Sequence, residues 1–330
     1  MKNIRLSVLD LSVVTEGGTT ATAIQRTVDL AQHAEELGYE RIWLAEHHNM
    51  EYIASSATSV LIGHVAGHTS TIRVGSGGIM LPNHAPLAIA EQFGTLESMY
   101  PNRIDLGLGR APGTDQQTAM ALRRNNMQAV YNFPSDIRAL QNYFSSQNSH
   151  SAVRAFPGEG LDIPIWVLGS STDSAYLAAE MGLPYAFAAH FAPTQFRIAI
   201  EIYRNNFKPS EQLAQPYVLA CVNGIAADTN EEAQVLATSM YRMFLGIITN
   251  TRKPLMPPVP SMDPYWNPEI EAAVKQMTAC TFVGDKDSLY DQFSKFTDET
   301  GVDELMITGN IYDNEARLKS YRILSEVFSM

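Results

Sequence analysis

The sequence predicts an α/β fold: a (β/α)8 TIM barrel formed by one domain over residues 1–330, with an insertion in its C-terminal part. Three observations predict it. Eight apolar segments of strand length are spread along the chain, a helical segment follows each, and glycines separate several helices from the next strand. Eight strand-helix units in one chain are typical of a closed parallel barrel. A doubly wound sheet with a small second domain is the alternative, and it explains eight evenly spaced units less well.

The expected strands are residues 4–11, 41–47, 72–80, 103–109, 163–169, 185–190, 216–225 and 304–309. After the first strand, Thr22 and Gln25 have capping-box spacing, which predicts the start of a helix that Gly38 ends. The same order of helix, glycine and strand recurs at Gly182 and Gly301. At each position we expect the glycine to adopt the left-handed conformation that closes a helix.

Two stretches interrupt this regular order. Residues 110–133 form a long polar connection after the fourth strand, longer than an ordinary loop of a barrel. Residues 246–280 contain six prolines together with Tyr265 and Trp266, which predicts neither regular helix nor central strand. This proline-rich excursion is either a rigid surface segment or a partly ordered lid that supplies apolar walls to a pocket. Its place on the catalytic face of a barrel favours the lid.

Composition excludes several classes of partner. The formal net charge of −12 argues against nucleic acid and anionic membrane as partners. The two cysteines, Cys221 and Cys280, are far apart, so neither a disulfide nor a zinc framework is expected, which fits a reducing cytoplasm. We expect no signal peptide before the strand at residue 4, and no apolar run approaches membrane-spanning length. A cytoplasmic protein with a small-molecule substrate is therefore expected.

The second strand ends in an abrupt change from apolar residues to Glu46, His47 and His48. Such groups at the end of a parallel strand usually face a ligand. No metal site is expected, because neighbouring strand residues point to opposite sides and no further ligand spacing supports zinc. We expect one of the two histidines to be packed and hydrogen-bonded. His47 is expected at the pocket mouth as an acid, a base or a hydrogen-bond donor.

Glycines mark the end of the third strand. Gly75, Gly77 and Gly78 fall within four residues, where each is costly in a strand. They predict either a bulge that fits the taper of the barrel or bare backbone against a flat ring.

An anion site is expected after the fourth and fifth strands. Arg110 follows the fourth strand between glycines, where it suits a phosphate, although a surface ion pair explains it equally well alone. Ser171 and Ser174 lie at the start of the helix after the fifth strand, where backbone amides and the helix dipole favour an anion. Because these strands are neighbours in a barrel, Arg110 can face that helix terminus. Phosphate sites in barrels more often follow strands seven and eight, so this site is a variant.

Together these segments resemble the bacterial luciferase-like monooxygenase family of flavin-dependent TIM barrels, and they look closest to its single-chain bacterial group. The matching motifs are residues 43–48, 77–82, 109–110, and 168–171 through 182–184. The resemblance implies that Arg110, Ser171 and Ser174 hold the phosphate of the flavin. It implies that His47 is the catalytic histidine, which assists a flavin peroxide intermediate. It also implies a non-proline cis peptide at Gly77-Gly78 beside the isoalloxazine ring.

The resemblance further implies an enzyme that uses reduced FMN and O2 to oxidise an aldehyde or another small organic substrate. It implies a homodimer, and since nothing resembles a nicotinamide site, a separate reductase is expected to supply reduced FMN. Gly109 stands where light-producing chains carry a cysteine, which argues against efficient luminescence. An F420-dependent hydride transferase is an alternative, but its acidic cofactor calls for a basic channel, and the clustered cations are limited to Arg123 and Arg124. A flavin-binding barrel without catalysis is the other alternative.

Overall fold

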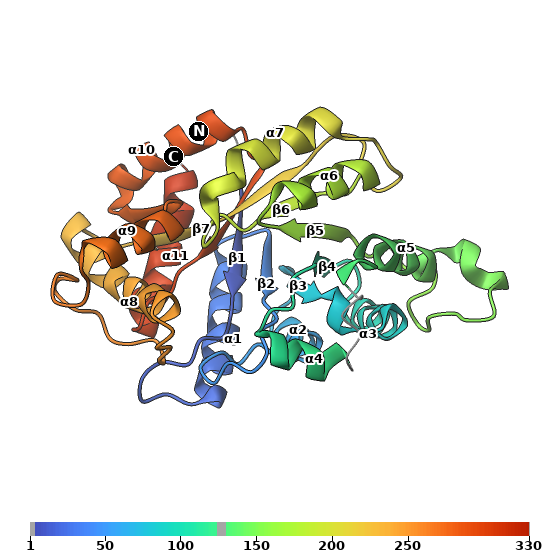
Figure 1. Cartoon of the computed structure of the whole chain (residues 1–330), viewed down its shortest axis with the longest axis horizontal. Helices are drawn as coiled ribbons and strands as arrows, with labels where there is room; N and C mark the ends of the chain where they lie inside the picture. Colours follow the sequence, from blue (N-terminus) through green and yellow to red (C-terminus); the bar gives the residue numbers. More distant parts are fainter. Residues whose placement is uncertain (1–3, 124–129, 330) are drawn as a thin grey trace.

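The computed structural model describes residues 4–123 and 130–329, and it is a closed barrel of parallel strands ringed by helices (Figure 1). The barrel strands are β1 (Arg5–Asp10), β2 (Arg41–Leu44), β3 (Arg73–Met80), β4 (Ile104–Gly109), β5 (Ile165–Gly169), β6 (Tyr185–Phe187), β7 (Val218–Ala226) and β9 (Glu304–Thr308). They pair in this order, and β9 returns to β1. The predicted (β/α)8 barrel is confirmed, although two strands end three residues before the predicted end, β2 at Leu44 and β6 at Phe187.

A ninth strand lies outside the barrel closure. β8 (Thr281–Gly284) pairs with the last four residues of β7, whereas β9 pairs with the preceding part of β7. The sequence did not predict it, because four residues carry no periodicity of their own. β8 exists because β7 is nine residues long and extends past the barrel.

The helices between the strands are α1 (Thr20–Glu36), α2 (Thr58–Gly67), α3 (Pro86–Met99), α5 (Phe133–Phe144), α6 (Thr172–Met181), α7 (Phe196–Asn206), α8 (Asn230–Ile248), α10 (Lys286–Thr300) and α11 (Asn314–Phe328). The capping box of α1 is formed by Thr19 and Thr22, so the predicted box that began at Thr22 was wrong by three residues. Gly182 and Gly301 end α6 and α10 in the left-handed conformation, with φ of 62° and 59°, as predicted. Gly38, which follows α1, also has a positive φ, of 76°.

Both interruptions contain a helix that the sequence did not predict. The connection after β4 contains α4 (Gln116–Arg123), and the proline-rich excursion contains α9 (Pro268–Met277). The expectation of no regular helix over residues 246–280 was wrong here, because Pro268 lies in the first turn, where a missing N–H costs nothing. Backbone hydrogen bonds between Leu255 and the loop after β1 hold the rest of the excursion in place. The backbone amide of Val259 also donates to the hydroxyl of Thr238 in α8.

A buried ion network closes the barrel at the amino ends of its strands. Arg41 lies 2.7 Å from Asp105 and 2.8 Å from Glu304, and all three are almost completely buried. Arg73 also contacts Asp105 at 2.6 Å, and the Tyr217 hydroxyl donates to Glu304 at 2.8 Å. Burial lowers the pKa of Arg41, but the two carboxylates outweigh this and raise it, so the cation is stable. Paired charged side chains therefore close the amino end of the barrel interior.

Apolar side chains pack on both faces of the barrel sheet, outside against the helices and inside the barrel. The main core lies between the strands and the surrounding helices, and a smaller cluster that includes Leu9, Trp43, Leu219 and Met306 lies in the barrel interior above the ion network. Among the described residues, no helix combines the length and apolar character needed to cross a membrane.

Candidate active site at the carboxyl ends of the strands

The structure brings every predicted site residue to the same end of the barrel. His47 follows β2, Gly77 and Gly78 lie in β3, Arg110 follows β4, and Ser171 and Ser174 follow β5. These four strands are consecutive neighbours in the sheet. The expected cluster is a consequence of strand order, since parallel neighbours place their carboxyl ends side by side.

His47 is held in one hydrogen-bonded state. Its Nδ1 lies 3.2 Å from the carbonyl oxygen of Gly113, and because a carbonyl can only accept, Nδ1 carries the hydrogen. The neutral ring therefore keeps an unprotonated Nε2. Burial lowers the pKa of His47, the Gly113 carbonyl opposes this, and the nearby Arg252 lowers the pKa further. The ring is thus a neutral hydrogen-bond acceptor or base at neutral pH.

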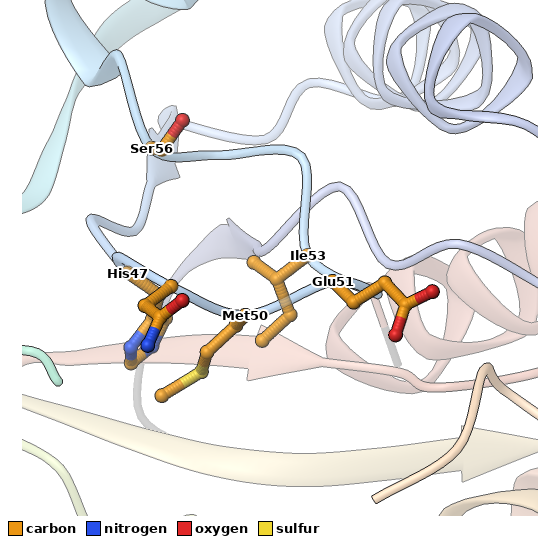
Figure 2. A pocket seen from close by; sticks show the side chains of 6 residues that line it. His47, Met50, Glu51, Ile53 and Ser56 are labelled. Carbon is orange, nitrogen blue, oxygen red and sulfur yellow. The ribbon is translucent and has the colours of Figure 1, made fainter. Parts of the chain in front are cut away.

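His47 lines a cavity of about 490 Å³ formed by the segment between β2 and α2. Figure 2 shows the side chains of His47 and Met50 on one side of this segment, with Ile53 close by and Ser56 farther along. This space is open on much of its surface, so the loop forms one wall of a ligand site and does not enclose a molecule by itself. Its lining comes from residues 47–56, so the idea that the proline-rich excursion supplies apolar walls stays a prediction.

Glu46 anchors the same loop from beneath. Its carboxylate is 1% exposed and accepts hydrogen bonds from His48 at 2.8 Å, from His84 at 2.9 Å and from the Met80 amide at 3.1 Å. Burial raises the pKa of Glu46, but these hydrogen bonds outweigh it and lower the pKa to about 2. His48 is thus the packed histidine that the sequence predicted. His84 was not predicted, because its only signal is its position after a strand.

Glu46, His48 and His84 also form a group whose ligand atoms lie within 4.8 Å of one another, a spacing that a divalent cation can bridge. Hydrogen bonds already satisfy the same atoms, so the arrangement is explained as an anchor for the loop that carries His47.

This anchor gives a prediction for stability against pH. The pKa of Glu46 is lowered from 4.5 to about 2, so its contribution is present above pH 4.5 and is lost as the pH falls to 2, an effect of about 3 kcal/mol. Glu46→Gln removes the titrating group. Its free energy of unfolding, measured with urea between pH 5 and pH 2.5, should therefore fall less steeply than that of the wild type. Exposed Glu51→Gln is the control, and a Glu46→Gln slope equal to this control's would contradict the prediction.

The bulge expected in β3 and the cis peptide implied by the resemblance are both present, and contact of this backbone with a flat ring stays a prediction. The peptide bond between Gly77 and Gly78 is cis, and the register of β3 against β4 shifts between Gly77 and Ile79. A methyl group at Gly77 would lie 2.8 Å from the Leu9 side chain, and one at Gly78 would lie 2.8 Å from the Gly107 carbonyl. Glycine is therefore required here by close packing within the barrel, in addition to any ligand that lies against this backbone.

Arg110 faces the start of α6, as predicted. Its guanidinium lies 3.3 Å from the carboxylate of Asp173 in the first turn of that helix, and the two side chains are 46% and 71% exposed. Ser171 occupies the N-cap position, but its hydroxyl makes no cap hydrogen bond. The Ser174 hydroxyl donates to the Ser171 carbonyl at 2.7 Å and lies 2.9 Å from the Tyr185 hydroxyl. Ser171 and Arg110 are therefore freer to contact an anion than Ser174 is.

The sequence model of the luciferase-like monooxygenases matches residues 4–304. The chain belongs to the luciferase-like monooxygenase family. This luciferase-like chain is 49% identical over 326 residues to a luciferase-like monooxygenase of Escherichia coli (strain K12), covering 99% of this chain and 97% of the relative. It is 40% identical over 237 residues to the N-acetyl-S-alkylcysteine monooxygenase of Bacillus subtilis (strain 168), with 70% of each chain covered.

Solved structures agree with this family. The crystal structure of apo-MsnO8 matches with a TM-score of 0.92 and 36% identity, over 99% of this luciferase-like chain and 98% of that one. Two more distant structures share the fold. One is the oxygenating constituent of 3,6-diketocamphane monooxygenase of Pseudomonas putida with FMN, at a TM-score of 0.74 and 16% identity over 98% and 97% of the chains. The other is an F420-dependent secondary alcohol dehydrogenase, at 0.70 and 10% over 97% of each. The family and its monooxygenases indicate an oxidoreductase.

Proposed function

We propose that this protein is an FMN-dependent monooxygenase, which uses reduced flavin and O2 to oxidise an aldehyde or another small organic molecule. One observation carries the proposal: a half-exposed guanidinium at a helix start, a cis glycine peptide and a neutral histidine share one end of the barrel. The monooxygenase named for N-acetyl-S-alkylcysteine adds thioethers to the substrates worth testing.

The residues present fit the phosphate of FMN. Arg110 supplies a cation, α6 presents its amino end, and the unused hydroxyl of Ser171 can donate a hydrogen bond. A phosphate would replace Asp173 as the partner of Arg110. The hydroxyl of Ser174 is already hydrogen-bonded, so Ser174 would support the phosphate site indirectly, by holding the backbone carbonyl of Ser171 in place.

The remaining residues would orient the ring and the substrate. Gly77 and Gly78 offer bare backbone to a flat ring, and His47 offers its Nε2 as an acceptor for a proton of the reacting groups. Bound in its reduced form, FMN would supply the two electrons with which one oxygen atom enters the substrate and the other leaves as water. The protein would contribute position, shielding from water and one proton acceptor.

F420 is the alternative cofactor, and the charges of the described residues favour FMN. Arg123 is buried and donates to the Asn83 side chain at 2.9 Å, so it is not an exposed cation for an acidic tail. Arg124, its expected companion, lies outside the described residues. A flavin-binding role without catalysis is the second alternative, and it would use the same phosphate site.

The proposal extends to partners and location. We propose a separate reductase as the source of reduced FMN, a homodimer as the working form and the cytoplasm as the compartment, all on the basis of the family resemblance. Light scattering of the purified protein tests the dimer, and addition of an NADH-dependent flavin reductase tests the source of electrons.

Replacing Arg110 should weaken binding of reduced FMN. A hydrogen bond to a charged group contributes about 1.5–3 kcal/mol, so Arg110→Ala is expected to raise the dissociation constant by roughly 10- to 150-fold. Anaerobic calorimetry measures it. Arg138→Ala, which removes an exposed arginine on α5, is the matched control and should bind as the wild type does. Equal affinities for both variants would remove Arg110 from the phosphate site.

Isotope labelling tests the function itself. The protein is combined with FMN, NADH, a flavin reductase and ¹⁸O2, and a panel of aliphatic aldehydes and thioethers is offered. Incorporation of one ¹⁸O atom into a product is the expected result. Consumption of O2 with hydrogen peroxide as the sole product, across the panel and in the same amount as without the protein, would favour the non-catalytic alternative.

A further inference from the structure

A second, smaller cavity lies on the axis of the barrel. It has a volume of about 40 Å³, and seven of the eight barrel strands contribute to its wall. Leu9, Trp43, Leu219 and Met306 form an apolar lining, and Gly77, the first residue of the cis peptide, forms part of the same wall. The cavity therefore lies beside the backbone that the proposed function assigns to the flavin ring.

One strongly polar side chain is part of this wall. His190 follows β6, and its Nδ1 is buried and has no hydrogen-bond partner within residues 4–123 and 130–329. Burial, followed by the neighbouring His47, lowers the pKa of His190 to about 3, so the ring is neutral at any physiological pH. The backbone of His190 is fixed by Asn223, whose amide donates to the His190 carbonyl at 2.6 Å.

The small volume and apolar surface of the cavity determine which molecules can occupy it. A trapped water needs two to four polar partners, but the accessible surface of this wall is almost entirely apolar, and Nδ1 of His190 is not exposed to it. Apolar walls of this kind favour small apolar molecules, and a volume of about 40 Å³ is too small to enclose a whole organic substrate. Dioxygen is apolar and diatomic, and it is a reactant in the proposed reaction.

We propose that this cavity is a dioxygen-binding site, in which apolar side chains of the barrel interior hold O2 beside Gly77-Gly78. The inference rests on the proposed function and deepens it. The cavity binds O2 without reducing it, and the electrons come from reduced FMN.

Xenon tests the cavity without any flavin. Xenon is an apolar probe of similar size, so crystals of the wild-type apoprotein under xenon pressure should show a peak within the wall formed by Leu9, Leu219 and Met306. A wild-type crystal without xenon there, or one in which ordered water fills the cavity, would overturn the proposal.

Kinetics test the role of the cavity in the reaction. Ala186→Val adds two methyl groups to the wall, and Ala220→Val makes the same change on the neighbouring strand, where the side chain packs in the outer core. In stopped flow, the rate constant for oxidation of enzyme-bound reduced FMN by O2 should fall about tenfold in Ala186→Val and stay at the wild-type value in Ala220→Val. Thermal unfolding checks that both variants fold.

The outcomes separate the two proposals. If wild-type protein binds no reduced FMN, the proposed function fails, while the xenon peak still decides the nature of the cavity. If FMN binds and Ala186→Val reacts with O2 as fast as the wild type, the dioxygen site is wrong and the proposed function stands. A crystal with FMN whose ring itself occupies the cavity would also overturn the dioxygen site.

Discussion

His47→Ala is expected to lower turnover by about 10²- to 10⁴-fold, the range for loss of a positioned acid or base, while the affinity for reduced FMN stays near that of the wild type. The reason is geometric. Nδ1 of His47 donates to the Gly113 carbonyl, and the lowered pKa keeps Nε2 unprotonated, so the ring can accept a proton but makes no contribution to the phosphate site. Turnover is measured with the substrate that the labelling experiment identifies, and affinity by anaerobic calorimetry.

The control is another histidine. His64→Ala removes an exposed imidazole from α2 and should change neither quantity. If His47→Ala lost turnover and FMN affinity to the same extent, His47 would be part of the binding site and not of the reaction.

Arg41→Met is expected to destabilise the fold by about 3–5 kcal/mol, because it leaves the buried carboxylate of Glu304 without its cation. Arg41 lies between Asp105 and Glu304. Arg73 pairs with Asp105 but not with Glu304, so after the substitution Asp105 still has a cation and Glu304 does not. Glu304 would then keep hydrogen bonds from neutral groups such as the Tyr217 hydroxyl, which do not compensate a buried charge. The free energy of unfolding in urea at pH 7 measures the effect.

The matched control is Arg5→Met. Arg5 pairs with Glu40 at 3.6 Å with a side chain that is 56% exposed, and an exposed pair contributes at most about 1 kcal/mol. A loss in Arg41→Met no larger than that in Arg5→Met would contradict the role of the ion network in closing the amino end of the barrel.

The sequence predicted the barrel because its signals are local. Apolar strands and helix-ending glycines such as Gly182 and Gly301 are each read within a few residues, and the order of eight units then determines the topology. β8 was missed because it depends on a distant partner, the extension of β7. α9 was missed because a proline that prevents a helix in the interior of a segment begins one at the first turn.

The same contrast between local signals and distant contacts applies to the residues of the candidate site. His47 and Arg110 could be predicted to meet because each follows a strand, and Gly77 lies in the last half of the strand between them, so strand order places all three at one end of the barrel. His84 and His190 were missed, because loops bring them to the site and no spacing along the chain connects them with His47. Their roles depend on tertiary contacts, which a single sequence does not show.

The central claim is that this end of the barrel binds reduced FMN through Arg110. The most direct measurement is an anaerobic titration of the purified apoprotein with FMN and F420, each oxidised and reduced, followed by fluorescence and calorimetry. We predict a preference for reduced FMN that Arg110→Ala weakens and Arg138→Ala leaves unchanged. A preference for F420 would assign the protein to hydride transfer, and binding of neither cofactor would contradict the function proposed for it.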